Sequence, residues 1–507
     1  MNLLFVIHNW VGYAPHGGTE VHAITLVEAL AQTETNQVYV LFPDTTAASD
    51  CNNYILFNIK NKTSKQINLS YPVTSNCYSH QEFFAKFEFI LLQQKIDIVH
   101  IFHLIRFPLN TPLIAKKAGA KVIISLFDYY LICQQFNLLK KNKIFCNYPN
   151  ITIPTCDLCL KQNFNSQVGT QNTRRNTISQ ILYYTDAVHY LCQDQYNRFI
   201  IAYPYLQDKV NLIMGLGTGA FFTEQDIPNK LNNFALPLKV ACVGNFDTNK
   251  GAELIIQIID YYQSTQQNIQ FHIYGDVRYP YSDILPSANK NVKVYGQYTP
   301  EELPNLLQQC HVALFASIWP ETFVLALSEV WSCGLIPVAP NIGAFRERIT
   351  HGQNGFLYEL TDSGSIITIL DNFLKMTTKS FLNLLKQVSQ VKYPSLESNI
   401  NQYLSLYTHI QNTKCELNTL ELLSRVIIEE HHIETHHIET HHTETYHIET
   451  HPEIQQLPNP EQPIPPISEN KHLLNKAWQY YKQQGLLSTI KRSVNYTWQR
   501  IQKIQKI

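Results

Sequence analysis

Apolar runs of four to six residues alternate with longer amphipathic segments over the first 410 residues of the 507-residue chain. The runs have the length and composition of buried strands, and the segments between them have the spacing of helices. Strands are expected at residues 3–7, 38–42, 98–101, 122–126, 239–244 and 271–275. This alternation predicts parallel sheets covered by helices, so the expected fold class is α/β.

The segment from residue 313 to residue 340 has the clearest pattern. The runs ALFAS and LIPVAP predict two buried strands, and about three helical turns between them end at Gly334. Glu321 falls at the expected helix start and Glu329 falls among apolar positions, roughly 12 Å further along the axis at 1.5 Å per residue. A buried carboxylate needs a partner, and a helix N-terminus attracts phosphate. The pair of carboxylates suits a ligand with two sugars joined by phosphates. The alternative is that Glu321 caps the helix and Glu329 is a solvated helix position.

The same segment resembles the donor-site signature of the family-4 retaining glycosyltransferases. The matching residues are Pro320, Glu321, Thr322, Phe323, Glu329 and the run CGLIPV, followed by NIGAFRE and HGQNGF. Val324 replaces a family glycine and Val330 a family alanine, and we treat both as mild departures. The resemblance spans about the first 400 residues. It implies two Rossmann-like, doubly wound domains facing each other across a cleft, which is the GT-B fold.

The resemblance also implies roles for these residues. Glu321 is expected to contact the transferred sugar as a catalytic residue, and Glu329 is expected to bind the ribose. Thr322 and Phe323 are expected to bind the donor beside them. The reaction implied is transfer of a sugar from a nucleotide diphosphate with retention of configuration.

Two glycine-containing loops are expected at the phosphates. Gly17 and Gly18 follow the first strand and open a helix, so they would shape the cleft there, although an ordinary tight turn fits them as well. The family motif G-R-x5-K-G, whose cations neutralise the diphosphate, reads GNFDTNKG here. Lys250 is in register, while Asn245 replaces the arginine and keeps only hydrogen-bonding ability. A solvated loop lysine is the alternative for Lys250.

A second departure lies after the fourth expected strand. Many relatives have a histidine in L-H-D-Y-W that reaches the reaction centre, but this chain has Phe127 in LFDYY. Phenylalanine can neither titrate nor donate a hydrogen bond. Asp128 or His103 is expected to take over this role; otherwise the imidazole is dispensable or activity has been lost. A half-buried structural histidine is the alternative for His103.

Four cysteines, Cys133, Cys146, Cys156 and Cys159, have the spacing C-x12-C-x9-C-x2-C. The closing C-D-L-C resembles a zinc knuckle, so a structural zinc is one prediction. Reduced cysteines packed as small apolar groups, or a redox-labile pair, are the alternatives. The resemblance implies no cofactor for catalysis, and the donor half has no obvious Asp-x-Asp motif.

Four parts are expected along the chain. Residues 1–213 form an acceptor-side Rossmann-like domain with the cysteine-containing loop 133–159, and residues 214–410 form the nucleotide-sugar-binding domain. Residues 411–470 form a linker with repeated HHIET units and a Pro-rich stretch, which predict disorder or, alternatively, metal binding. Residues 471–507 form a basic amphipathic helical tail with eight Lys or Arg and no acid. This tail suits an anionic membrane surface, a partner, or docking on the protein itself.

Composition limits the function classes. A net charge of -1 gives no indication of nucleic-acid binding, and no apolar run is long enough to span a membrane. Eleven cysteines without an export signal predict a cytoplasmic protein. If the basic tail binds a membrane, the protein is expected to be peripheral at the inner face of the plasma membrane. The expected function is a glycosyltransferase with a glycan or lipid-linked acceptor in bacterial cell-surface polysaccharide synthesis. The alternatives are a catalytically silent sugar-nucleotide-binding scaffold and a GT-B nucleotide-sugar 2-epimerase.

Overall fold

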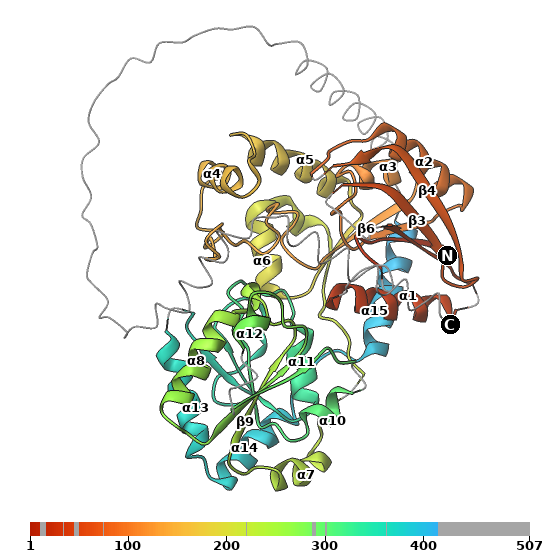
Figure 1. The fold of residues 1–507 in the computed structure, drawn as a ribbon. Coiled ribbons are helices and arrows are strands. Elements are labelled where there is room, and N and C mark those ends of the chain that lie inside the picture. The colour runs from red at the N-terminus through yellow and green to blue at the C-terminus, as the bar shows by residue number, and fades with distance from the viewer. Residues whose placement is uncertain are drawn as a thin grey trace, which may run out of the picture. The chain divides into compact units, whose positions relative to one another are not determined.

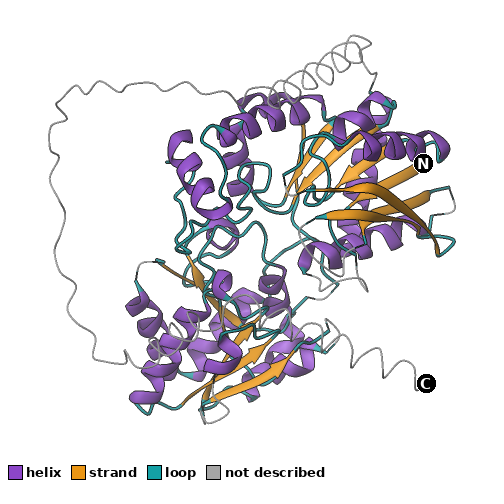
Figure 2. Ribbon diagram, turned by 45° about the horizontal axis from the view of Figure 1, so that its top comes forward, coloured by secondary structure: helices purple, strands orange, loops and turns teal. Residues whose placement is uncertain are grey.

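The computed structural model describes residues 1–413 except 11–16, 34, 45–49, 75, 220, 286–290, 300–301 and 361. The predicted linker from residue 414 on and the basic tail therefore lie outside the described residues. In the described part, no helix combines the length and apolar character that crossing a membrane requires. Figures 1 and 2 show two α/β halves, each with a central sheet and helices on both of its faces.

The first half contains an eight-stranded sheet in the order β4-β3-β2-β1-β5-β6-β7-β8. Its strands are β1 (Asn2–Val6), β2 (Gln37–Pro43), β3 (Cys51–Asn58), β4 (Thr63–Val73), β5 (Ile98–Ile101), β6 (Lys121–Leu126), β7 (Ala187–Tyr190) and β8 (Val210–Ile213). The four strands predicted in this half are confirmed and pair in parallel. The antiparallel pair β3–β4 was not predicted, because β4 lies at the sheet edge with mostly exposed, polar positions.

The second half contains a six-stranded, wholly parallel sheet in the order β11-β10-β9-β12-β13-β14. Its strands are β9 (Leu238–Val243), β10 (Ile269–Tyr274), β11 (Val292–Gly296), β12 (Val312–Leu314), β13 (Ile336–Pro340) and β14 (Phe356–Tyr358). Numbered from β9, this is the Rossmann order 3-2-1-4-5-6. Ligands of such sheets bind at the carboxyl ends of the strands where the order reverses, which here is between β9 and β12. The two predicted doubly wound domains are thus confirmed.

Helices cover both sheets. The first half has α1 (Gly18–Ala31), α2 (Gln81–Gln93), α3 (Thr111–Lys117), α4 (Ile153–Phe164), α5 (Thr170–Tyr184), α6 (Gln193–Ala202) and the 3-10 helix η1 (Pro204–Asp208). The second half has η2 (Glu224–Asp226), α7 (Ile227–Asn232), η3 (Thr248–Lys250), α8 (Ala252–Ser264), α9 (Tyr281–Ile284), α10 (Leu303–Leu307), α11 (Leu325–Ser332), α12 (Gly343–Arg348), α13 (Ser363–Leu374) and α14 (Thr378–Val388). The last described helix is α15 (Leu396–Asn412).

Helix α15 returns to the first half, beside α1, although the predicted boundary assigned it to the second (Figure 1). Its fully buried Tyr403 and Tyr407 pack in the same core as Leu3 and Ile7 of the first half. The Tyr403 hydroxyl lies 3.1 Å from His22 Nε2 and 3.2 Å from His189 Nδ1. The Tyr407 hydroxyl lies 2.7 Å from Nδ1 of the buried His100. Hydrogen bonds between buried tyrosines and histidines therefore hold α15 against the first half.

Candidate functional site

The donor side is built where the order of the second sheet reverses. Lys250 ends the short helix η3 after β9, and Glu321 lies in the loop after β12. The Lys250 ammonium contacts Glu321 Oε1 at 2.5 Å, and the Ser317 hydroxyl donates to the same oxygen at 2.7 Å. Strand order thus joins two motifs that lie 71 residues apart. The alternative of a purely solvated loop lysine does not fit this contact.

Gly251 is required for that approach. Its φ of +74° is left-handed, and a Cβ there would lie 1.9 Å from the Ala316 carbonyl oxygen. Any other side chain would push η3 away from the end of β12. The two residues of the Lys-Gly pair therefore act differently. Lys250 provides a positive charge, and Gly251 allows η3 to approach the end of β12.

Glu321 does not lie on a helix, so the predicted helix start and three-turn length are wrong. Helix α11 begins at Leu325 and has eight residues, about two turns, so Glu321 is not its cap. The Glu321 carbonyl accepts a 2.8 Å hydrogen bond from the Ala344 N–H, and Gly343 leaves room for this loop. The Glu321 side chain is 7% exposed. A well-anchored loop, rather than a helix turn, holds this carboxylate.

Val324 precedes α11 in a left-handed conformation, with φ +66°. For a β-branched residue this conformation is strained, so replacing the family glycine is not the mild departure we expected. The half-buried Arg348 guanidinium stabilises the turn, donating to the carbonyls of Phe323 at 2.6 Å and Val324 at 3.0 Å and to the Ser328 hydroxyl at 2.5 Å. Burial lowers the pKa of Arg348 to about 9, which leaves it charged at neutral pH.

Glu329 lies on α11 in a largely apolar setting, as predicted. Its Oε2 is 3.5 Å from the Tyr298 hydroxyl, a long and weak contact. Burial raises the pKa of Glu329 to about 7, with only a small opposing effect from Tyr298. This is not the environment of a solvated helix carboxylate. Tyr298 is a site residue that sequence reasoning missed.

Thr322 and Phe323 are buried and make contacts that hold the site together. The Thr322 hydroxyl donates to the Phe127 carbonyl at 2.7 Å and so joins the two halves. Phe323 is 5% exposed, and its ring lies against Arg348 and Gly215, where a Cβ would come within 2.1 Å of the ring. Both residues are as buried as Glu321, and their predicted contact with the donor stays a prediction.

Asn245 lies in the loop between β9 and η3, as its motif position predicts. The nearby cation Arg278 forms ion pairs with Asp247 at 3.1 Å and Asp276 at 3.5 Å. Lys250 is 40% exposed, so a ligand can reach its ammonium group. Both cations are paired with carboxylates and partly exposed, so the motif register, rather than exposure, favours Lys250 for the predicted phosphate contact.

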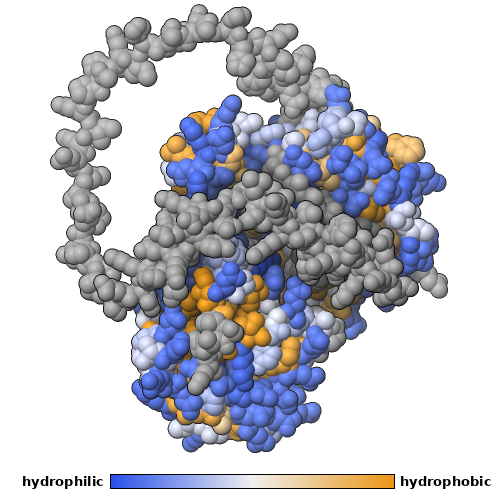
Figure 3. Space-filling model, viewed as in Figure 1, coloured by the Kyte–Doolittle hydropathy of each residue, from blue (hydrophilic) through white to orange (hydrophobic). Residues whose placement is uncertain are grey.

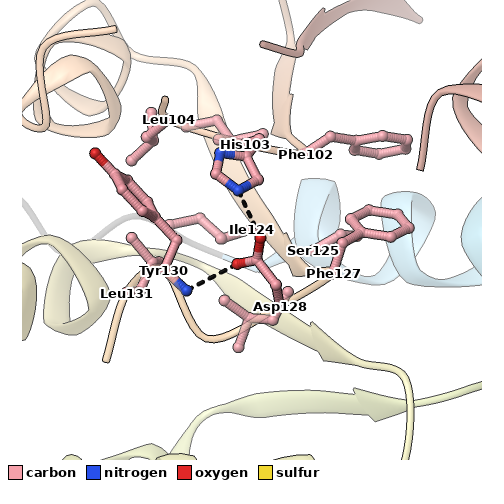
Figure 4. A pocket seen from close by; sticks show the side chains of 11 residues that line it. Phe102, His103, Leu104, Ile124, Ser125, Phe127, Asp128, Tyr130 and Leu131 are labelled. Carbon is pink, nitrogen blue, oxygen red and sulfur yellow. Dashed lines mark hydrogen bonds and ion pairs between the residues drawn. The ribbon is translucent and has the colours of Figure 1, made fainter. Parts of the chain in front are cut away.

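The facing side of the first half holds His103 and Asp128, at the ends of β5 and β6 (Figure 4). His103 Nδ1 accepts from the Ile105 N–H at 3.0 Å, so Nε2 carries the proton and donates to Asp128 Oδ2 at 2.9 Å. Asp128 Oδ1 accepts from the Tyr130 N–H at 2.7 Å. The Phe127 ring points away from this pair, as Figure 4 shows. His103 and Asp128 are thus a coupled unit, and their catalytic role stays a prediction.

A second coupled pair, His8 and Glu20, was missed. Glu20 in the first turn of α1 contacts His8 Nε2 at 3.1 Å and accepts from the Gly17 N–H at 2.8 Å. Burial alone would raise the pKa of Glu20, but His8 and the Gly17 N–H outweigh it and lower this pKa to about 2. The His8 ring lies 4.5 Å from the His103 ring, centroid to centroid. A histidine just after β1 and the glutamate of GGTE were the available signals.

The predicted glycine loop reaches the donor side. A Cβ on Gly18 would lie 3.0 Å from Leu325 Cδ1, the first residue of α11. In addition, the Glu347 carboxylate accepts from the first-turn N–H groups of α6, Gln193 and Asp194, at 3.1 Å each. These contacts and Thr322 place the glycine loop, His103 and Asp128 opposite Glu321.

The four loop cysteines share one neighbourhood. Electrostatic interactions link the Cys146 thiol with those of Cys133, Cys156 and Cys159. Burial raises the pKa of all four, to about 12 for Cys133 and about 11 for Cys156. Among the described residues, no three His, Cys, Asp or Glu side chains form a group that could hold a metal ion. The geometry here is that of reduced, packed thiols, and the zinc stays a prediction.

Residues 223–390 match the model of the family Glycosyl transferases group 1. The chain is a glycosyltransferase. This matched range contains Lys250, Glu321, Glu329 and the motif between them. A comparison with curated protein sequences finds no match.

Solved structures share the GT-B fold with this glycosyltransferase. HepE from Anabaena in complex with UDP is 16% identical, with a TM-score of 0.54, over 81% of this chain and 100% of that one. The starch synthase IV catalytic domain of Arabidopsis thaliana, bound to ADP and acarbose, is 16% identical with a TM-score of 0.52, over 81% and 99%. Sucrose-phosphate synthase from Thermosynechococcus elongatus is 16% identical with a TM-score of 0.54, over 81% and 98%. At this identity the likeness establishes the fold.

Proposed function

We propose that this glycosyltransferase moves a sugar from a nucleotide diphosphate to a glycan or lipid-linked acceptor with retention of configuration. Glu321 would contact the transferred sugar, Lys250 and the start of α11 the diphosphate, and Glu329 the ribose. The observation that carries the proposal is the contact of Lys250 with Glu321 beside α11, at the carboxyl ends of β9 and β12. Structures with this fold bind UDP or ADP, which supports a nucleotide donor.

The chemistry follows from charge. A nucleoside diphosphate leaves as the glycosidic bond breaks, and fixed positive charge stabilises the charge that develops on it. Lys250 is exposed enough to transfer its contact from Glu321 to an incoming phosphate. That exchange would free the Glu321 carboxylate for a sugar hydroxyl. On the acceptor side, the coupled pair of His103 and Asp128 offers a carboxylate near the same point.

The test is turnover of a panel of UDP-, ADP- and GDP-sugars by the full chain, with release of the nucleotide as the readout. Lys250→Ala should lower turnover by about 100-fold, as removal of one preorganised donor does in other enzymes. Glu397→Ala, an exposed change on α15, is the control and should leave turnover unchanged. The anomeric configuration of the product, read by NMR, tests retention.

If the protein is instead a catalytically silent sugar-nucleotide-binding scaffold, no donor should be turned over. This alternative is favoured by Phe127 and Asn245, which remove an imidazole and a guanidinium from the family pattern. If the panel shows tight nucleotide binding but no turnover of any donor, the enzyme proposal is wrong. A 2-epimerase would instead convert the free nucleotide-sugar without an acceptor.

A further inference from the structure

A surface rich in lysine follows Asp128 in the chain. Residues 129–185 contain six Lys or Arg and a single acid, Asp157. That acid is buried, and its Oδ1 accepts a 2.9 Å hydrogen bond from the Gln171 N–H. This segment therefore exposes basic side chains and no carboxylate, in a chain whose overall charge is -1.

Large apolar side chains are exposed in the same segment. We define the basic-apolar surface by the exposed residues Lys140, Lys141, Lys143, Ile144, Leu158, Lys161, Phe164 and Val168. The apolar members are strongly exposed, at 58% for Ile144, 58% for Leu158 and 71% for Val168. Figure 3 shows hydrophobic and hydrophilic side chains next to each other over α4. None of the four lysines forms an ion pair within the part of the chain that the structure describes.

Local bonding holds this surface in place. The turn from Lys140 to Ile144 is closed by the hydrogen bonds of the Lys140 N–H to the Ile144 carbonyl and of the Lys143 N–H to the Lys140 carbonyl, both 2.9 Å. Lys140 also interacts electrostatically with Cys159 of α4, so the turn and the helix are neighbours. Helix α4 packs against α5, and the hydrogen bond between Gln171 and Asp157 joins the two helices.

We propose that the basic-apolar surface docks this protein on an anionic lipid bilayer. Lysines near a negatively charged membrane surface are attracted to it, and exposed aliphatic side chains gain by entering the boundary between headgroups and acyl chains. A soluble polyanion would interact favourably only with the lysines. An anionic membrane would interact favourably with both the lysines and the exposed apolar side chains, and the segment exposes no carboxylate that the membrane charge would repel.

The segment that carries this surface is also anchored next to the site. Arg174 of α5 donates to the Tyr130 carbonyl at 2.5 Å, two residues beyond Asp128, so the segment is tied to the end of β6. Docking there would bring Asp128 and His103 towards an acceptor anchored in the bilayer. The docking itself does not depend on the proposed function, because binding needs no turnover.

The test is sedimentation of the full chain with vesicles of phosphatidylcholine, with and without phosphatidylglycerol. The wild-type chain should bind only the anionic vesicles, and Lys140→Glu/Lys141→Glu/Lys143→Glu should bind them more weakly by on the order of 100-fold. Ile144→Ser/Leu158→Ser should lose the binding that persists in high salt, where charge attraction is screened. Circular dichroism and nucleotide affinity check that each variant is folded.

Matched controls separate this surface from charge or hydrophobicity elsewhere. Lys375→Glu/Lys379→Glu/Lys386→Glu reverses three exposed lysines of the second half, and Leu92→Ser/Ile201→Ser removes two exposed aliphatic residues from α2 and α6. Both should bind like the wild type. Equal binding by the triple lysine variant of the surface and its control would overturn the proposal, since the basic tail would then account for the affinity. Binding to heparin but not to vesicles would also overturn it.

Discussion

The raised pKa of Glu329 predicts that donor binding depends on pH, if Glu329 binds the ribose as proposed. A ribose hydroxyl donates its hydrogen to a carboxylate, so the ionised form of Glu329 is the form that should bind. Burial raises its pKa from 4.5 to about 7, so ionisation occurs in the neutral range. The affinity for a nucleotide-sugar should therefore rise between pH 6 and pH 8.

The magnitude follows from the pKa. With a pKa of about 7, about a tenth of Glu329 is ionised at pH 6 and about nine-tenths at pH 8, which predicts a roughly tenfold rise in affinity. Stability should change in the opposite direction. The folded state holds a proton that the unfolded state has lost between pH 4.5 and 7, so about 3 kcal/mol of stability is lost as pH rises through that window.

The assay is calorimetric titration of UDP-glucose or ADP-glucose at several pH values in two buffers with different ionisation enthalpies. Nucleotide-sugars are preferred to free diphosphates, whose terminal phosphate titrates in the same range. Binding at pH 6 should release close to one proton. Glu329→Gln cannot ionise, so it should bind weakly at every pH and release none, while Glu397→Ala should behave like the wild type.

A 2′-deoxy donor sharpens the test, because it removes one of the hydroxyls that the carboxylate would accept from. It should bind more weakly than the ribose form at pH 8, with a smaller difference at pH 6. An affinity that does not change between pH 6 and pH 8, or a Glu329→Gln variant with the wild-type pH profile, would refute the assignment of Glu329 to the ribose.

Three further predictions concern the frame around the site. Val324→Gly should relieve left-handed strain and raise stability by about 1 kcal/mol in urea unfolding, whereas Val324→Ala, which keeps a Cβ, should not. Burial lowers the pKa of His22 to about 3 and of His189 to about 4, so the folded state excludes protons that the unfolded state takes up below pH 6.5. Stability is therefore complete above pH 6.5 and falls below it, by about 2 kcal/mol per histidine at pH 5, and an unchanged urea midpoint at pH 5 would contradict this. Arg348→Met should weaken binding of the donor diphosphate more than binding of the bare nucleoside, and equal losses for both would indicate a purely structural role.

The sequence predicted the local pattern of this fold well, because strands buried on both faces are continuous apolar runs. The strand at residues 98–101 is found at its predicted bounds, and Glu329 is in the apolar setting that its neighbours indicated. Motif order also placed Lys250 and Glu321 in one half. Their direct contact was not predictable from spacing, because it depends on the order of strands in the sheet.

Other features depend on conformation that side-chain type does not encode. Glu321 was placed on a helix because the apolar stretch continues through Phe323 and Val324, but the left-handed turn at Val324 delays the helix to Leu325. The edge strand β4 escaped prediction because its positions are mostly polar. His8 and Glu20 could not be paired from the sequence, since they come from a strand end and a helix start that meet only in the folded chain.

Arg348 could replace part of the positive charge that is lost where Asn245 takes the place of the family arginine. Diphosphate binding needs positive potential at the start of α11, and the helix dipole supplies part of it. Arg348 donates to the carbonyls of Phe323 and Val324 immediately before that helix, and it forms no ion pair within the described residues. Its charge, opposed only by the more distant Glu347 carboxylate, would therefore add to the field at the start of the helix. On the proposed function, a cation in this place would strengthen binding of the diphosphate, while Lys250 would leave Glu321 and stabilise the charge that develops as the bond breaks.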